Sequence, residues 1–325
     1  MYRLALIGAG QLGSRHLQAL AKSDFSLEIE VVDKSEESLK TAKDRFSEIT
    51  ENRNVKKVDY YTSVTQIQPE IDLCIIATTS DIRARVTKEL LHRASVRYIL
   101  FEKVLFQSLA EYDEMEGLLK NKGVNAWVNC PRRIYPFYIN LKEELANKND
   151  LFFMVYGGEW GLACNAIHFI DLLAFLSGGL DYSIEKDGLD SSVIDSKREG
   201  YIELTGTLQG VFGNGCKFFL HSCRGSLAPH IIAISSRDSQ IIVDEDRGNA
   251  RLSRRTSNWI WEDLSFAVPF QSDLTHTVVE NILLEGKCGL TPFIESAELH
   301  KTLLRKLLEY LRTMRGEEVT LCPIT

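Results

Sequence analysis

The chain has 325 residues with a formal net charge of −7, and 44% of the residues are hydrophobic. This length exceeds what one hydrophobic core usually serves, so we expect two domains, and the modest acidic excess offers no basic face for nucleic acid. The seven cysteines include no Cys-x-x-Cys pair, which argues against a disulfide framework and a structural zinc site.

The first part of the chain alternates short apolar runs with longer helical patterns, as a parallel sheet with crossover helices does. Strands are predicted at 4–7, 27–32, 71–77, 98–101 and 124–128. Helices are predicted after a glycine turn at 8–13 and at 38–46, 83–93 and 109–120. The pattern predicts a doubly wound parallel sheet of the Rossmann type, which we assign to residues 1–125.

The pattern changes after Asn129 to Pro136, where two prolines interrupt regular structure. Strands are predicted at 151–156, 201–208, 216–221, 231–235 and 240–243, most of them without a helix between. Helices are predicted at 162–176, 274–285 and 294–314. We assign residues 126–325 to a second α/β domain with a mainly antiparallel open sheet.

Gly8, Gly10 and Gly13 form a G-x-G-x-x-G turn between a predicted strand and a predicted helix, with Gln11 and Leu12 completing it. In this context the first glycine permits a tight turn, the second lets the backbone approach a pyrophosphate, and the third lets the helix pack closely. The helix amino terminus adds unpaired N–H groups. The turn predicts a dinucleotide site; the alternative is a glycine turn with no ligand.

Asp33 stands 20 residues after Gly13, at the end of the second predicted strand. A carboxylate there accepts hydrogen bonds from the ribose hydroxyls and repels a 2′-phosphate, so NAD is favoured over NADP. The neighbouring Lys34 weakens that preference. Thr78 and Thr79 follow a central strand at its carboxyl end, where open α/β sheets bind ligands, and are expected at the cofactor.

Glu102 and Lys103 follow the predicted strand at 98–101 and so reach the same edge of the sheet. A lysine there can hydrogen-bond a substrate oxygen and stabilise charge while an alcohol and a carbonyl interconvert. The alternative is a solvated surface pair.

The predicted helix at 162–176 carries Cys164, His168 and Asp171 at spacings of four and three, so the three side chains share one face, with Asn165 in reach of it. A histidine among polar partners suits acid–base chemistry. The alternatives are a core histidine satisfied by hydrogen bonds and half of a zinc site that lacks a third ligand.

The order and separation of these motifs resemble the Gfo/Idh/MocA oxidoreductases over nearly the whole chain. The segments that carry the resemblance are the glycine turn with Ser14-Arg15-His16-Leu17, Ile76-Ala77-Thr78, Glu102-Lys103, 129–136, 157–173 and 290–297. That family acts largely on sugars, inositols and nucleotide-linked sugars. The resemblance implies an NAD(P)-dependent oxidoreductase acting on a CH–OH or C=O carbon, assembled as a homodimer or a dimer of dimers.

The resemblance also implies catalytic residues. Lys103 matches the lysine of the family's Glu-Lys-Pro motif, and His168 matches the histidine of its Asp-x-Gly-x-His helix. Val104 stands where the family has proline, and Cys164 stands where it has aspartate. Since a non-proline cis bond costs about 3 kcal/mol, we expect a trans bond between Lys103 and Val104.

The replaced aspartate leaves the substrate contacts open. Trp160, Cys164 or Asn165 is expected to contact the substrate instead, alongside Asp171. Arg132 and Arg133 follow the domain boundary. Either one of them holds an anionic substrate group or both are surface charges.

Three functions fit these residues: a sugar or nucleotide-sugar dehydrogenase, a redox-neutral sugar-modifying enzyme with tightly bound NAD, and a non-catalytic NAD-binding sensor. Lys103 and His168 beside an intact glycine turn favour a catalyst over the sensor. No run approaches the roughly 18 apolar residues of a membrane span, and no signal-peptide core precedes the first strand. We therefore expect a cytoplasmic protein with a small-molecule partner and neither a membrane nor a metal.

Overall fold

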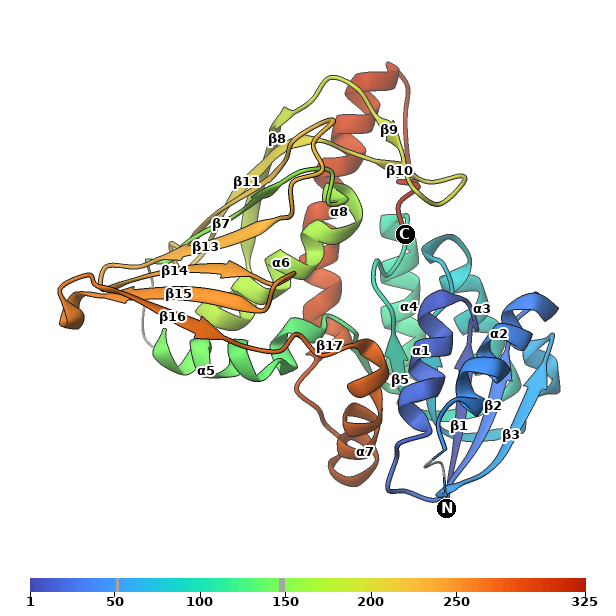
Figure 1. Cartoon of the computed structure of the whole chain (residues 1–325). Helices are drawn as coiled ribbons and strands as arrows, with labels where there is room; N and C mark the ends of the chain where they lie inside the picture. Colours follow the sequence, from blue (N-terminus) through green and yellow to red (C-terminus); the bar gives the residue numbers. More distant parts are fainter. Residues whose placement is uncertain (51–52, 146–149) are drawn as a thin grey trace. The chain divides into compact units, whose positions relative to one another are not determined.

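The computed structural model describes residues 1–50, 53–145 and 150–325, which divide into two compact units (Figure 1). Unit 1 comprises Met1–Phe106, Ala110–Asn129 and Pro269–Ile294. Unit 2 comprises Gln107–Leu109, Cys130–Val268 and Glu295–Thr325. The chain thus leaves unit 1 after Asn129 and returns to it at Pro269, whereas the sequence prediction assigned everything after residue 125 to one second domain.

Within the described residues, the sheet of unit 1 has seven strands in the order β17-β6-β5-β4-β1-β2-β3. They are β1 (Tyr2–Ile7), β2 (Leu27–Val32), β3 (Val55–Tyr61), β4 (Glu70–Ile76), β5 (Ser95–Phe101), β6 (Asn125–Val128) and β17 (Thr291–Pro292). The pairs from β3 to β6 are parallel, and β17 runs antiparallel to β6. The predicted doubly wound parallel sheet is confirmed, with its topological switch point between β1 and β4.

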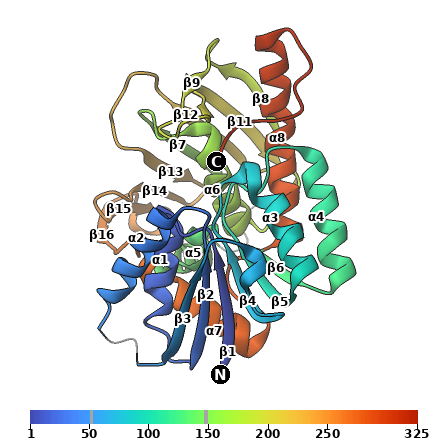
Figure 2. The same cartoon turned by 90° about the vertical axis from the view of Figure 1, so that its right-hand side faces the viewer.

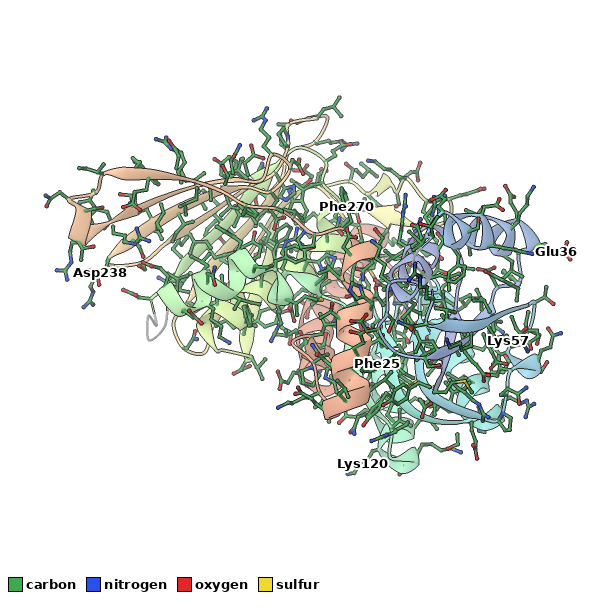
Figure 3. All side chains as sticks on the ribbon, turned by 60° about the horizontal axis from the view of Figure 1, so that its bottom comes forward. Phe25, Glu36, Lys57, Lys120, Asp238 and Phe270 are labelled. Atoms are coloured by element: carbon green, nitrogen blue, oxygen red, sulfur yellow. The ribbon has the colours of Figure 1, made fainter. Side chains whose placement is uncertain are left out.

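The helices of this fold are α1 (Gln11–Leu20), α2 (Glu36–Ser47), α3 (Ser80–Arg93), α4 (Leu109–Lys122) and α7 (Thr275–Glu285). Right-handed crossovers place α1 and α2 on one face of the sheet and α3 and α4 on the other, and α3 and α4 lie side by side in Figures 1 and 2. Ser35 caps α2 by accepting a hydrogen bond from the Ser38 N–H. Glu36 in the first turn of α2 and Lys57 on β3 both lie at the surface of unit 1 (Figure 3).

The connection from β3 to β4 contains a single 3-10 turn, Val64–Gln66, in place of a crossover helix. The face of β1, β2 and β3 opposite α1 and α2 therefore carries charged side chains, including Arg3, Glu28 and Lys57. By contrast, the central strand β4 is buried from Leu73 to Ile76, as its continuous apolar run predicts.

The sheet of unit 2, as far as the chain is described, has eight strands in the order β16-β15-β14-β13-β7-β12-β11-β8. They are β7 (Phe152–Gly157), β8 (Tyr182–Leu189), β11 (Gly206–Phe212), β12 (Lys217–Ser222), β13 (Ile231–Ser235), β14 (Ser239–Asp244), β15 (Asn249–Arg254) and β16 (Trp261–Ser265). Only β7 and β12 pair in parallel among these described strands. The predicted mainly antiparallel sheet is confirmed.

The helices of unit 2 are α5 (Pro136–Glu144), α6 (Leu162–Ser177) and the part of α8 (Phe293–Arg315) that follows Ile294. α6 lies between two glycines with left-handed backbone, Gly161 at φ 79° and Gly178 at φ 73°. A small separate ladder joins β9 (Ile194–Asp195) to β10 (Ile202–Glu203).

The single strand predicted at 201–208 is wrong, because the chain forms β10 and β11 there, in two different sheets. Gly206, the first residue of β11, has φ +97°, and a Cβ at this position would lie 2.5 Å from the Gly188 carbonyl oxygen. Strands β3, β8, β15 and β16 were not predicted. They lie at or beside the sheet edges, where half of the side chains face solvent and the apolar alternation is diluted.

Candidate functional site

The glycine turn between β1 and α1 has the geometry that a dinucleotide requires. Gly8 has φ +95°, and a Cβ on Gly13 would lie 1.8 Å from the Gly8 carbonyl oxygen. A Cβ on Gly10 would meet nothing within 4 Å, so open space lies beside this residue. No side chain caps α1 at Gly10, which leaves the first-turn N–H groups to a ligand. These features fit a pyrophosphate.

Asp33 lies directly beside this turn. Its Oδ2 accepts a hydrogen bond from the Ala9 N–H at 2.7 Å, and its Oδ1 accepts one from the Ser35 N–H at 2.9 Å. Because each carboxylate oxygen accepts more than one hydrogen bond, the half-buried Asp33 retains capacity for ribose hydroxyls.

Thr78 and Thr79 follow β4 next to the turn. The Thr78 hydroxyl is buried and has no hydrogen-bond partner in the described part of the chain, and Thr79 makes no side-chain capping bond to α3. An orphaned buried hydroxyl at the switch point of a doubly wound sheet fits a bound cofactor.

Lys103 is the one residue between Tyr98 and Phe106, all of them described, that is not buried. The Lys103–Val104 peptide bond is cis, so the expected trans bond is wrong. The expectation considered only the local cost, whereas tertiary contacts also hold this segment. The Arg83 guanidinium donates to the carbonyl oxygens of Val104 and Leu105.

Glu102 belongs to a closed set of five hydrogen-bonded side chains, the Glu102 ring: Glu102, His16, Thr275, Gln271 and Asn129. Glu102 Oε1 lies 2.9 Å from His16 Nε2 and 2.5 Å from Asn129 Nδ2. Asn129 Nδ2 lies 2.8 Å from Gln271 Oε1, and Gln271 Nε2 lies 2.8 Å from Thr275 Oγ1. Thr275 Oγ1 closes the ring at 2.8 Å from His16 Nδ1.

The ring determines the state and direction of the Glu102 carboxylate. Burial acts to raise its pKa, but the hydrogen bond and charge of His16 and the hydrogen bond of Asn129 prevail and lower it. The side chain is 4% exposed, so it faces the ring rather than the ligand edge where it was predicted. A contact between Glu102 and the cofactor would therefore use the backbone atoms of Glu102.

Helix α6 presents Cys164, Asn165 and His168 as half-buried residues, whereas Asp171 is 1% exposed. The shared face that the spacing predicted is therefore open to solvent at its amino-terminal end. Glu203 on β10 caps this end, because its carboxylate accepts hydrogen bonds from the N–H groups of Ala163 at 3.0 Å and Cys164 at 2.9 Å.

Sequence reasoning missed Glu203, since nothing local links a residue 39 positions downstream of Cys164 to this helix. Burial raises the pKa of Glu203 despite these hydrogen bonds. Trp160 is held in front of the same helix: its indole N–H donates to the His221 carbonyl oxygen, and its own carbonyl oxygen accepts from Asn165.

Arg132 and Arg133 are not surface charges, since their side chains are 15% and 11% exposed. Arg132 binds the Glu245 carboxylate through two nitrogens, at 2.9 Å and 2.6 Å. Arg133 Nε donates to Asp171 at 2.7 Å. Both arginines are thus paired with carboxylates of their own unit, which weakens the prediction that one holds an anionic substrate group.

The Arg132–Glu245 ion pair strongly shifts the pKa of Glu245. Burial acts to raise the pKa of Glu245, but the charge of Arg132, with hydrogen bonds from His230, Arg132 and Tyr138, lowers it to about 2. The Arg132 guanidinium also lies 4.5 Å from the centre of the Phe169 ring on α6. The pair thereby joins α6 to β14 and its following turn.

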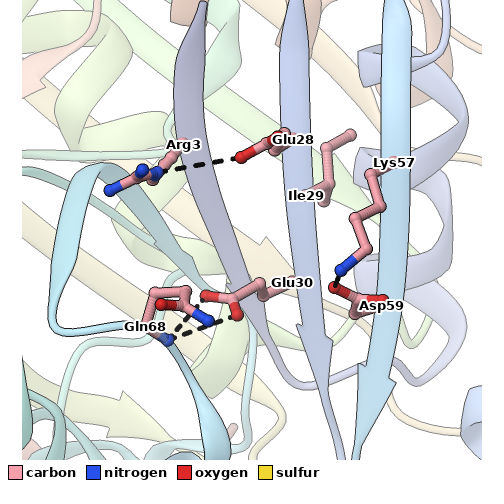
Figure 4. Close-up of a pocket in the computed structure, with 7 residues that line it drawn as sticks. All are labelled: Arg3, Glu28, Ile29, Glu30, Lys57, Asp59 and Gln68. Carbon is pink, nitrogen blue, oxygen red and sulfur yellow. Dashed lines mark hydrogen bonds and ion pairs between the residues drawn. The ribbon is translucent and has the colours of Figure 1, made fainter.

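A polar pocket of about 260 Å³ lies on the open face of β1, β2 and β3 (Figure 4). Its charges pair with one another, Lys57 with Asp59 at 2.6 Å and Arg3 with Glu28 at 3.7 Å. Glu30 accepts hydrogen bonds from the Gln68 N–H. The pocket lies away from the carboxyl strand ends where doubly wound sheets bind ligands, so it is not part of the candidate site.

Within residues 1–50, 53–145 and 150–325, no three His, Cys, Asp or Glu side chains are grouped as a metal site requires. No helix in the same ranges is long and apolar enough to cross a membrane. The structure describes Lys103 and the glycine turn in unit 1, and His168, Trp160 and both arginines in unit 2.

Residues 2–130 match the model of an oxidoreductase family with an NAD-binding Rossmann fold. This match confirms the predicted resemblance to the Gfo/Idh/MocA oxidoreductases over this part of the chain. No curated protein matches the chain in sequence.

Solved structures share the fold over nearly the whole chain. A Gfo/Idh/MocA family oxidoreductase from Vibrio cholerae has 16% identity and a TM-score of 0.71, covering 98% of this chain and 100% of the other. UDP-N-acetylglucosamine 3-dehydrogenase from Acidithiobacillus ferrooxidans has 16% identity and a TM-score of 0.69, covering 94% and 96%. A super-repressor mutant of Gal80p from Saccharomyces cerevisiae has 15% identity and a TM-score of 0.72, covering 98% and 97%. At such identities the likeness shows the fold alone.

Proposed function

We propose that the protein is an NAD-dependent oxidoreductase that transfers a hydride between nicotinamide and a CH–OH or C=O carbon of a sugar or nucleotide-linked sugar. The observation that carries the proposal is Lys103, half-buried in an otherwise buried stretch, at the edge of the sheet that bears the glycine turn. Catalytic groups in open α/β sheets come from this edge.

The dinucleotide would be held by backbone groups of the glycine turn, by Asp33 at the ribose and by the Thr78 hydroxyl. When bound, its nicotinamide supplies the hydride acceptor or donor. Lys103 Nζ donates a hydrogen bond to the substrate oxygen and stabilises the negative charge that develops there. His168 takes the hydroxyl proton during oxidation and returns it during reduction.

The substrate class is supported by the family and by the internal pairing of the arginines. With Arg132 bound to Glu245 and Arg133 to Asp171, neutral hydroxyl groups suit unit 2 better than a carboxylate does. Trp160, Cys164 and Asn165 supply an indole face, a thiol and an amide beside His168, groups that can pack on a sugar ring and bond its hydroxyls.

A homodimer is also part of the proposal. The unit 2 sheet exposes apolar side chains on β7, β11, β12 and β14, with exposed fractions between 37% and 42%: Phe152, Tyr156, Val211, Phe219 and Ile242. An exposed apolar sheet face of this kind is typical of a protein interface.

The test combines two substitutions with a screen of free and nucleotide-linked sugars in the presence of NAD and of NADH. Lys103→Ala and His168→Ala are each expected to slow turnover about a hundredfold or more while leaving NADH binding almost unchanged. Wild-type turnover in both variants would refute the mechanism.

The same screen separates the alternatives. Stoichiometric conversion of NADH with product supports the dehydrogenase, and turnover without net NADH consumption supports a redox-neutral enzyme with tightly bound NAD. Because the chain shares its fold with the Gal80p super-repressor, a non-catalytic sensor is the third alternative that the screen addresses. Ligand-dependent binding to a protein partner, without turnover of any sugar, would support that sensor.

A further inference from the structure

The Glu102 ring joins four separate segments of unit 1: α1, the residue after β5, the residue after β6, and the start of α7 with the 3-10 turn Gln271–Asp273 before it. His16 and Thr275 are 0% exposed, and Glu102 and Asn129 are each 3% exposed. Buried side chains in such a network are costly unless every group is satisfied, so their arrangement is tightly specified.

The direction of several hydrogen bonds in the ring follows from the chemistry of its members. The ionised Glu102 only accepts, so His16 Nε2 and Asn129 Nδ2 both donate to it. The other Asn129 hydrogen goes to Gln271 Oε1, and Gln271 Nε2 therefore faces Thr275 Oγ1.

Thr275 Oγ1 lies 2.8 Å from His16 Nδ1 and 3.3 Å from the Gln271 carbonyl oxygen, so it links the imidazole to the segment before α7. Thr275 thus closes the ring.

Hydroxyl, imidazole and carboxylate in this order also occur in nucleophilic enzymes. Burial excludes that use here, because the Thr275 hydroxyl and the His16 ring have no exposed surface through which a substrate could reach them. The role of the ring therefore lies in what it holds.

The ring holds the backbone immediately before Lys103. On the other side of Lys103, Arg83 of α3 donates to the carbonyl oxygens of Val104 and Leu105. The half-buried Lys103 is thus anchored between two buried polar contacts, one of which reaches α1, the helix that begins at the glycine turn.

We propose that the Glu102 ring is a positioning device for Lys103, with Thr275 as the positioning residue that closes it. The proposal rests on the catalytic role of Lys103 given above. It assigns to His16, Gln271 and Thr275 the task of fixing Lys103 Nζ relative to the dinucleotide-binding end of α1.

The test compares Thr275→Val, which removes the hydroxyl at nearly constant volume, with Thr275→Ser, which keeps it. The full-length protein is acetylated with acetic anhydride, and modification of Lys103 is measured by mass spectrometry against the exposed Lys120. We expect Lys103 modification to rise at least about threefold in Thr275→Val and to stay at the wild-type level in Thr275→Ser, since a loosened lysine is more accessible.

In the turnover assay, Thr275→Val should lower kcat about tenfold or more, with KM and the NADH dissociation constant within about threefold of wild type. His300→Gln is the matched control. His300 is equally buried, 2.7 Å from the Ser296 carbonyl oxygen in α8, and its loss should lower stability without changing Lys103.

Gln271→Ala breaks the same ring at a half-buried position and replaces Thr275→Val if that variant does not fold. Unchanged Lys103 modification in folded, NADH-binding Thr275→Val or Gln271→Ala would overturn the proposal. Wild-type turnover of Lys103→Ala would refute the proposed function instead, while the acetylation result would still decide whether the ring positions Lys103.

Discussion

The two units place their polar groups by different means. In unit 1 the glycine turn, Asp33, Thr78 and Lys103 all stand at the carboxyl ends of neighbouring parallel strands, so backbone geometry brings them to one edge. In unit 2 buried ion pairs do the placing, such as Arg132 with Glu245, which are 113 residues apart. Substitutions in the glycine turn of unit 1 should therefore act through steric contact with the backbone, and substitutions of the buried ion pairs in unit 2 should act through charge.

The largest effect is expected at the glycine turn. Gly13→Ala forces a Cβ to within 1.8 Å of the Gly8 carbonyl oxygen, so the helix must move and NADH affinity should fall more than about a hundredfold, with a loss of stability. Gly10→Ala is the control, because a Cβ there meets nothing within 4 Å. Gly10→Ala should weaken NADH binding and leave the melting temperature unchanged. An equal decrease of the melting temperature in Gly10→Ala and Gly13→Ala would contradict this distinction between the two glycines.

The next effect concerns charge in unit 2. The pKa of Glu245 falls from 4.5 to about 2 on folding, so its contribution is present above about pH 4.5 and is lost as the pH falls toward 2. This contribution amounts to about 3 kcal/mol. Urea unfolding between pH 7 and pH 3 should show that Glu245→Gln has a lower free energy of unfolding than wild type at pH 7. As the pH falls, this free energy should decrease less in the variant than in the wild type. Parallel profiles for variant and wild type would exclude Glu245 as the source.

A smaller effect is expected at the cap of α6. The folded pKa of Glu203 is raised, so its carboxyl favours the folded state most below its ordinary pKa and loses that contribution as the pH rises. Because Glu203→Gln resembles the protonated acid, it should keep stability at pH 7 within about 1 kcal/mol of wild type, a smaller change than in Glu245→Gln, and it should remove the pH dependence that Glu203 contributes. The same urea series measures both; a larger loss for Glu203→Gln would reverse the assigned charge states.

The smallest effect on stability is expected from the substitution that tests cofactor choice. Asp33→Ala removes the carboxylate that would repel a 2′-phosphate, so the ratio of NADPH to NADH affinity should rise about tenfold with little change in stability. Fluorescence titrations with both nucleotides measure the ratio. An unchanged ratio would show that Asp33 does not lie at the ribose.

The difference between strand-end residues in unit 1 and long-range ion pairs in unit 2 also explains what could be predicted from the sequence. The parallel sheet, the glycine turn and the position of Lys103 after a strand follow from periodicity and from residues at strand ends, which are local signals. The cis bond after Lys103 was missed because the expectation weighed only the local cost of the bond, whereas Arg83 of α3 also contacts this segment. Glu203 and Glu245 were missed because they reach α6 and Arg132 across long sequence separations, and nothing near them in sequence marks a cap or a buried pair.

The return of Pro269–Ile294 to unit 1 has a consequence for how the chain is made. Gln271 and Thr275 lie in this returning segment, so a ribosome that has completed Asn129 has not yet synthesised two of the five groups of the Glu102 ring. His16 and Asn129 must wait for the last quarter of the polypeptide before their buried hydrogen bonds can close. A fragment ending at Asn129 should therefore keep its sheet incompletely ordered, and adding Pro269–Ile294 as a separate peptide should restore protection of its amides from hydrogen exchange.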